Sequence, residues 1–317
     1  MKRLRRILCV VLLMCQALCA VAESGEENQM DNIILDADFS QGAWIYSPAK
    51  PMRMTGKLPL SDSEEDPEWL LTQWNSKNNI RGTQAQVVDG AYIYENEYKT
   101  VARDAQGVLT LRVNASEEYH RVRTSKMDSW VHLYFEQRYA NPYPLAGMGS
   151  APLRLSFCVP EFRDATPEGE LDPSLHAAIA VFYVILKDMN PQSPAYGDFI
   201  NFCVMLYDNR TPVTPESLFV DSGQNPIDAT NMMIYTMDSS TYAGEVYADG
   251  VWHDIDIDLM PYFQHALRET QERGYMAGTK MEDLCISSVF FGFEVPGVMD
   301  CELRVRDLSL GLKPVEE

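Results

Sequence analysis

The stretch SWVHLYFEQRY, residues 129–139, combines aromatic rings with titratable groups at alternate positions. Alternation places Trp130, His132, Tyr134, Glu136 and Arg138 on one face of a strand, while the other face is mostly apolar. Sugars have apolar C–H faces and polar rims, so rings that lie beside hydrogen-bonding groups suit them. We predict that this face binds a glycan. The alternative is structural: the rings pack under a loop, and Glu136 pairs with Arg138.

The segment FFGFEVPG contributes another candidate ligand-binding residue, Glu294, a lone acid on an otherwise aromatic strand. This acid either faces a cleft or leaves the sheet at an edge. Glycoside hydrolysis uses two carboxylates about 5–10 Å apart, and Glu136 and Glu294 could meet that separation if their strands are neighbours, which the sequence does not show. A polysaccharide lyase would instead need a base and a cation that neutralises a uronate, and His132, Tyr134 and Arg138 supply those types.

The segment VWHDIDIDL places Asp254, Asp256 and Asp258 on one face of a strand, together with Trp252. Three neighbouring carboxylates repel one another unless they are solvated or neutralised, and Ca²⁺ takes oxygen ligands of this kind. Asp254 and Asp256 are therefore candidate calcium ligands, although the segment does not match an EF-hand loop. The alternative is a solvated outer face on which Asp258 caps the helix that follows.

Standard catalytic signatures are absent from the sequence, which contains no GxSxG, HExxH or P-loop motif. A further polar group, Asp208 and Arg210 in NFCVMLYDNR, stands at the end of an expected strand. Strand ends often build sites, but a local ion pair is the interpretation we favour here. These observations favour binding over catalysis, and whether the protein is an enzyme stays open.

The elements that must position these residues are mostly strands. Ten or more short segments rich in Val, Ile, Tyr and Phe are separated by Gly, Pro, Asn and Asp, which predicts an all-β, jelly-roll-like sandwich of antiparallel sheets. One helix is expected at about 259–273, with Gly274 as its stop. We predict a single domain over 32–313, with a surface excursion at about 47–80 that contains a short helix at 67–75.

The amino terminus has the three parts of a secretory signal. A basic head precedes an apolar run from Ile7 to about Leu18, and Ala20-Val21-Ala22 offers a cleavage pattern. The alternative, a membrane anchor, needs about 20 apolar residues. We predict a signal peptide at 1–22, a disordered acidic linker at 23–31 and a secreted, extracellular protein with no membrane span.

Charge and cysteine content exclude some partners. Removal of the signal leaves 22 basic and 46 acidic residues, a net charge of −24, which should repel nucleic acid. Four cysteines remain after cleavage, Cys158, Cys203, Cys285 and Cys301. They allow two disulfides in any of three pairings, or four free thiols in apolar strands. We expect a fold that does not depend on disulfides.

The strand pattern resembles the concanavalin A-like and galactose-binding-like jelly rolls of exported bacterial proteins that handle polysaccharides. The residues that carry the resemblance are SWVHLYFEQ, GDFINFCVMLYDNR, WHDIDIDLMPYF and FFGFEVPGVMDCELRVRDLSL, within about 32–312. The Glu-x-Asp-x-x-Glu motif of the glucanases in that superfamily is absent, and the alginate lyase motifs are not found in their usual form. The resemblance implies association with a polysaccharide or oligosaccharide.

Taken together, the sequence predicts a secreted, non-catalytic carbohydrate-binding β-sandwich. One alternative is a glycoside hydrolase or polysaccharide lyase of the same fold. Another is a structural protein of the cell surface, in which a loop would cover the strand at 130–138.

Overall fold

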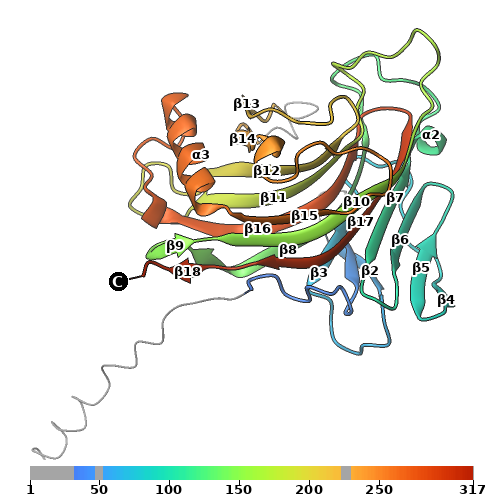
Figure 1. The fold of residues 1–317 in the computed structure, drawn as a ribbon, viewed down its shortest axis with the longest axis horizontal. Coiled ribbons are helices and arrows are strands. Elements are labelled where there is room, and N and C mark those ends of the chain that lie inside the picture. Colours follow the sequence, from blue (N-terminus) through green and yellow to red (C-terminus); the bar gives the residue numbers. More distant parts are fainter. Residues whose placement is uncertain (1–31, 47–52, 223–229, 317) are drawn as a thin grey trace, which may run out of the picture.

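A computed structural model describes residues 32–46, 53–222 and 230–316. The chain forms two large sheets and one two-stranded sheet (Figure 1). The nine-stranded sheet contains, in spatial order, β13 (Ser217–Val220), β14 (Met233–Thr236), β12 (Phe199–Asp208), β11 (Ile179–Asp188), β16 (Leu284–Val295), β8 (Val131–Pro144), β3 (Trp69–Thr72), β1 (Ala43–Tyr46) and β2 (Met54–Leu58).

The seven-stranded sheet contains, in spatial order, β15 (His253–Asp258), β10 (Pro152–Asp164), β17 (Met299–Leu310), β7 (Leu109–Asn114), β6 (Lys99–Arg103), β5 (Ala91–Glu95) and β4 (Gln86–Val88). Strands β18 (Lys313–Pro314) and β9 (Met148–Ser150) form the small sheet. Two α-helices, α2 (Ala115–Glu118) and α3 (Met260–Glu272), and two short 3₁₀ turns, η1 (Ser239–Thr241) and η2 (Met281–Asp283), complete the described elements.

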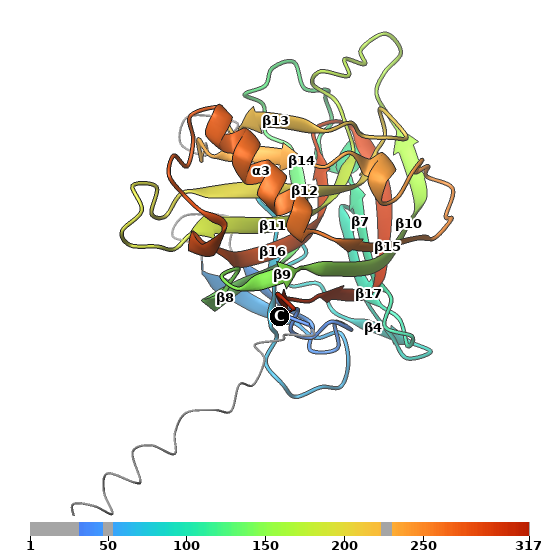
Figure 2. The ribbon, with the colours of Figure 1, turned by 60° about the vertical axis from the view of Figure 1, so that its left-hand side comes forward.

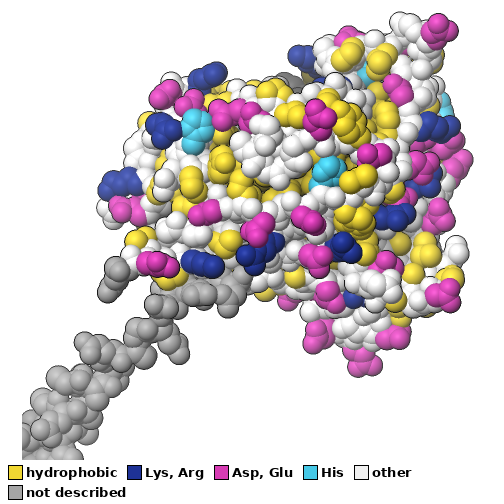
Figure 3. Space-filling view, viewed as in Figure 1, with side chains coloured by type: hydrophobic (Ala, Val, Ile, Leu, Met, Phe, Trp, Pro, Cys, Tyr) yellow, Lys and Arg dark blue, Asp and Glu magenta, His cyan; other side chains and the backbone are white. Residues whose placement is uncertain are grey.

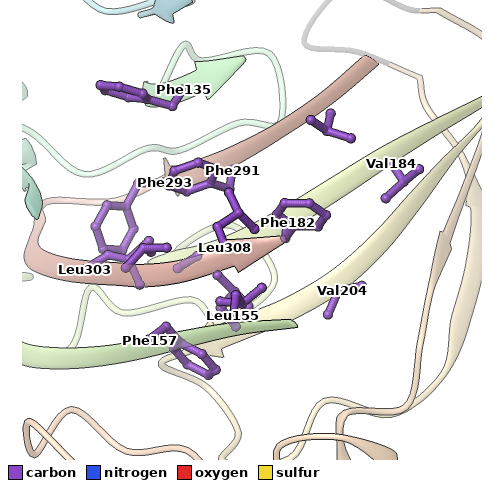
Figure 4. Packing of buried hydrophobic residues seen from close by; sticks show 14 of the residues in the cluster. Phe135, Leu155, Phe157, Phe182, Val184, Val204, Phe291, Phe293, Leu303 and Leu308 are labelled. Carbon is purple, nitrogen blue, oxygen red and sulfur yellow. The ribbon is translucent and has the colours of Figure 1, made fainter. Parts of the chain in front are cut away.

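All strand pairs except β1–β3 and β12–β14 are antiparallel. The two large sheets pack face to face and share one hydrophobic core. Figure 4 shows Phe135, Phe182 and Phe291 of the nine-stranded sheet in the same buried cluster as Phe157 and Leu303 of the seven-stranded sheet. These five side chains are at most 1% exposed, and burying each stabilises the fold by about 1.5–3 kcal/mol. The prediction of an all-β, jelly-roll-like sandwich is confirmed.

Helix α3 extends the layer formed by the seven-stranded sheet. It begins directly after the edge strand β15 and lies beside β12 (Figure 2). The Phe263 ring packs against Phe202 of β12, with centroids 4.8 Å apart. The Asp258 carboxylate accepts the Met260 amide at 3.0 Å, and Gly274 has a φ of +85° just past the last turn. The helix predicted at about 259–273 is confirmed. Its apolar residues, at helical spacing, cover strands that the seven-stranded sheet does not reach.

The predicted surface excursion at about 47–80 differs from the structure. Residues 69–72 form strand β3 inside the nine-stranded sheet, between β1 and β8, and Trp69 and Leu71 are fully buried in the core. The expected helix at 67–75 is therefore wrong, although the burial expected for Trp69 holds. A run of four residues gives too little periodicity to tell a buried strand from a helical turn.

The predicted signal peptide at 1–22 and acidic linker at 23–31 lie outside the described residues. Within the described residues, no helix is long and apolar enough to cross a membrane. Cys158, Cys203, Cys285 and Cys301 are all free thiols. Figure 3 shows acidic and basic side chains interspersed over one side of the molecule, with hydrophobic side chains between them.

Candidate functional site

The outer face of the nine-stranded sheet, the side turned away from the seven-stranded sheet, carries the residues predicted from strand 130–138. Strand β8 begins at Val131, and its inward residues Leu133 and Phe135 belong to the core. His132, Tyr134, Glu136 and Arg138 therefore share the outer face, as alternation requires. Of these, His132, Tyr134 and Glu136 are buried, so neighbouring side chains cover much of this face.

Glu294 joins the same face from the adjacent strand β16. It stands opposite His132 in the antiparallel register, and the Tyr134 hydroxyl donates to its Oε1 at 2.5 Å. The close contact between β8 and β16 at this point requires a glycine on β16. Gly292, opposite Tyr134, has a φ of +142°, and a Cβ there would lie 2.1 Å from the Leu133 carbonyl oxygen. The close approach of the two strands lets Tyr134 reach the Glu294 carboxylate, which is 22% exposed.

His132 is held in one tautomer by a main-chain contact. Its Nδ1 lies 2.9 Å from the carbonyl oxygen of Trp74, which can only accept a hydrogen bond, so the proton sits on Nδ1. Burial lowers the pKa of His132, and the Glu294 charge opposes this only in part. The ring is therefore neutral near pH 7, with the Nε2 lone pair 3.9 Å from Glu294 Oε2.

Glu136 and Arg138 form a two-pronged ion pair. Arg138 Nε lies 2.5 Å from Glu136 Oε1, and a terminal nitrogen lies 2.8 Å from Oε2. The Arg138 guanidinium also lies over the Tyr46 ring, 5.1 Å from its centroid. A comparable ion pair links Arg210 and Asp208 at the end of β12, as the sequence favoured.

Trp130 precedes the first residue of β8 and is half-buried under an arginine. The Arg123 guanidinium lies 4.6 Å from the Trp130 ring centroid, and the His132 ring lies 5.4 Å away on the strand. Arg123 donates to main-chain carbonyls of Ser125, Lys126, Asp128 and Leu175, which fixes its plane. The position of Trp130 is therefore set by a loop that Arg123 organises.

Four further rings on this face were not proposed as site residues from the sequence. Trp44 and Tyr46 alternate along β1, where Trp44 pairs with Leu70 and Leu70 pairs with Glu136, so they share its face. Trp74 follows β3 and packs on Tyr134 and Phe290, with ring centroids 5.5 and 5.9 Å apart. The rings of Trp44, Tyr46, Trp74, Trp130 and Phe290 are all partly exposed. The W-x-Y alternation at 44–46 was a usable signal.

The floor of the face continues over β11 and β12 through Tyr183 and Cys203. Both are buried, and burial raises the pKa of each, with the Glu294 charge acting in the same direction. For Cys203 the pKa rises to about 12, so the thiol stays protonated and is a poor nucleophile near pH 7.

The proposed pairing of Glu136 with Glu294 is not formed, although their strands are neighbours. Glu136 stands opposite Phe290, four residues from Glu294, which puts the two Cα atoms about 14 Å apart. The Glu136 carboxylate is also turned toward Arg138, away from Glu294. This spacing does not match the carboxylate pairs of either class of glycosidase.

The candidate calcium ligands lie on the opposite sheet, at its edge strand β15. Asp254 accepts from the Ser156 hydroxyl at 2.5 Å, and Asp256 pairs with Arg154 at 3.2 Å. Among the described residues, no group of three or more acidic, histidine or cysteine side chains is placed to hold a metal ion. Each aspartate has its own partner, so the arrangement does not favour calcium there.

A cavity of about 210 Å³ lies elsewhere, near the N-terminal turn. Its lining comprises Ala37, Asp38, Gln106, Gly107, Arg306, Asp307 and Leu308. It includes none of the residues predicted for a site, and it does not border the outer face described above.

Comparison with known proteins gives a likeness in fold. No protein-family profile and no curated protein sequence match the chain. Solved structures similar to it include endoglucanase Cel12A from Rhodothermus marinus, with 11% identity, 78% of this chain and 99% of that chain covered, and a TM-score of 0.38. The family 12 xyloglucanase from Bacillus licheniformis has 10% identity, coverages of 73% and 97%, and a TM-score of 0.42.

The xyloglucanase domain of NopAA, a type three effector from Sinorhizobium fredii solved in complex with cellobiose, has 10% identity, coverages of 74% and 100%, and a TM-score of 0.36. At these identities and TM-scores the likeness concerns the arrangement of strands. It carries no argument about the function of this chain.

Proposed function

We propose that the outer face of the nine-stranded sheet binds a glycan and that the protein is a secreted carbohydrate-binding β-sandwich. The observation that carries the proposal is the gathering of five partly exposed rings, Trp44, Tyr46, Trp74, Trp130 and Phe290, on one face. Aromatic rings of this kind offer flat apolar area to sugar C–H faces, while Glu294 offers a hydrogen-bond acceptor.

A glycoside hydrolase is the second candidate function, and Glu294 is the observation that favours it. This carboxylate is partly exposed, receives the Tyr134 hydroxyl and faces the neutral His132 ring, so it is positioned to exchange a proton with a bound substrate. The usual mechanism needs a second carboxylate, which Glu136 does not provide. Tyr134 cannot replace it as a nucleophile because its side chain is fully buried.

A polysaccharide lyase is supported less by the geometry. His132 Nε2 has the lone pair that a base needs, but the cation that would neutralise a uronate, Arg138, is already paired with Glu136. In the structural alternative, a loop covers the strand at 130–138. The burial of His132 and Tyr134 favours this alternative, and the partly exposed rings around them oppose it.

A glycan array probed with the chain from Glu23 onward tests the proposal, followed by calorimetry on the best soluble oligosaccharide. Saturable binding to at least one glycan is expected, and folded protein that binds none would reject it. Release of reducing ends by the wild type, lost in Glu294→Gln while binding persists, would establish hydrolysis. Binding without release by either protein would establish the non-catalytic function.

A further inference from the structure

Positive charge is scarce on the outer face of the nine-stranded sheet. Arg138 is the one lysine or arginine on strands β1, β3, β8, β12 and β16. Lys187 stands four residues beyond Tyr183 on β11, about 13 Å along that strand. Lys57 on the edge strand β2 bonds to the Glu65 carbonyl at 2.7 Å and approaches Asp66 at 3.6 Å. Among the described strand residues at the centre of this face, Arg138 is therefore the cation that a bound anion would meet.

The Arg138 guanidinium is partly exposed to solvent, but the buried Glu136 carboxylate compensates its charge. Its side chain is 37% exposed, while that of Glu136 is 6% exposed and occupies two guanidinium nitrogens. A carboxylate that forks an arginine in this way takes the geometry that a uronate would use. Glu136 thus neutralises the cation and occupies one of its two bidentate edges, the one formed by Nε and a terminal nitrogen.

Arg123, the other arginine near the rings, is not available either. It is 9% exposed, and its nitrogens donate to main-chain carbonyls, including that of Leu175 at 2.6 Å. It also lies against the Trp130 ring, which leaves no free fork for a ligand carboxylate.

The titratable group that a ligand would meet at the centre of the face is negative. Glu294 is 22% exposed and lies 3.9 Å from the neutral His132 ring.

We propose that Glu136 is a specificity-determining residue: by neutralising Arg138 it makes the outer face bind uncharged glycans and reject glycans that carry carboxylates. This inference rests on the proposed function of the same face. The first measurement compares the wild-type affinity for the neutral oligosaccharide with the strongest array signal and for the same oligosaccharide after oxidation of its primary hydroxyls to carboxylates. We expect the neutral form to bind more tightly.

Glu136→Gln keeps the side-chain shape and releases the Arg138 charge. We expect it to shift the ratio of the two affinities toward the carboxylated form by about tenfold at low salt, since a hydrogen bond to a charged group contributes on this scale. The matched control is Glu302→Gln, which releases Arg304 from a pair at 2.7 Å on strand β17 of the other sheet. It changes net charge equally and should leave the ratio unchanged.

The outcomes separate this inference from the proposed function. If the wild type binds no glycan, the proposed function fails and the inference fails with it. If the wild type binds the carboxylated form as tightly as the neutral one, binding stands and the charge selection is overturned. Charge selection by Glu136 is also overturned if Glu302→Gln shifts the ratio as much as Glu136→Gln, or if a folded Glu136→Gln shifts nothing. If Glu136→Gln does not fold, the wild-type ratio alone decides.

Discussion

The outer faces of the two sheets carry the same tryptophan–arginine arrangement. Trp130 directly precedes strand β8 and Trp252 directly precedes strand β15, and both are half-buried. The Arg123 guanidinium lies 4.6 Å from the Trp130 ring, and the Arg306 guanidinium lies 4.3 Å from the Trp252 ring. The position on the strand, the burial and the arginine contact are therefore alike for the two tryptophans.

Their surroundings differ. Beyond Trp130, the strand continues with His132 and Tyr134, whose rings pack under Trp74. Beyond Trp252, the strand continues with Asp254 and Asp256, which are exposed and pair with polar groups of β10. The first face is an aromatic platform over buried polar groups, and the second is an ordinary solvated surface. A tryptophan beside an arginine is therefore informative only together with the next residues on its face.

The largest expected effect separates the two sides of strand β16. Phe291 is 1% exposed within the core, and Phe290 is partly exposed on the outer face. Phe291→Ala should lower the free energy of unfolding by about 3–5 kcal/mol, as truncation of a core aromatic does. Phe290→Ala should cost about 1–2 kcal/mol, because it loses less burial. Urea denaturation measures both, and equal losses would show that the outer face is packed like the core.

A smaller effect is expected for Trp44, which lies on β1, toward the edge of the nine-stranded sheet. Trp44→Ala should weaken glycan binding by about 1–3 kcal/mol, the scale of an anchoring ring at an interface. The ring is partly exposed and approaches Lys57 at 5.8 Å, so melting should change little. Calorimetric titration beside a melting curve tests this. Unchanged affinity would confine the binding face to the strands around Trp130.

The pH dependence of stability tests the burial of His132. Its folded-state pKa lies below the ordinary 6.5, so the unfolded chain binds this proton first as pH falls. The stability that wild type has over His132→Gln should therefore decline as pH drops below 6.5. Burial raises the pKa of Asp36 to about 7, so its contribution to the stability of the fold is lost in the opposite direction, as pH rises from 3.8 to about 7. This contribution is the same in wild type and His132→Gln and cancels in the difference. A pH-independent difference would place His132 in solvent.

The smallest effect is expected from reductant. The four described cysteines are free thiols, three of them buried in the strands of a large core. Melting temperatures with and without dithiothreitol should agree within about 2 °C, less than the shift that 1 kcal/mol produces in a domain of this size. A clear drop under reductant would mean that disulfides form and stabilise the fold.

The sequence predicted the sandwich, the helix at α3 and the shared face of His132, Tyr134, Glu136 and Arg138. These follow from alternation and helical periodicity, which are local properties of the chain. It also offered the Glu136–Arg138 ion pair as an alternative, which the structure contains.

Other features depend on strand order and register, which local pattern does not encode. The insertion of β3 between β1 and β8 places Trp44, Tyr46 and Trp74 beside the candidate site, across more than 50 residues of sequence. The register of β16 on β8 brings Glu294 to His132 and keeps it away from Glu136. The sequence could therefore name the acids but not their separation.

The most direct test of the central claim is a titration of one glycan, the best array hit, into wild type, Trp130→Ala and Trp252→Ala. If the outer face of the nine-stranded sheet binds the glycan, Trp130→Ala weakens binding by about 1–3 kcal/mol with little loss of stability, and Trp252→Ala binds like wild type. Equal losses in both variants would contradict the claim. So would a loss of about 3 kcal/mol or more in the stability of Trp130→Ala, because that ring would then be part of the core.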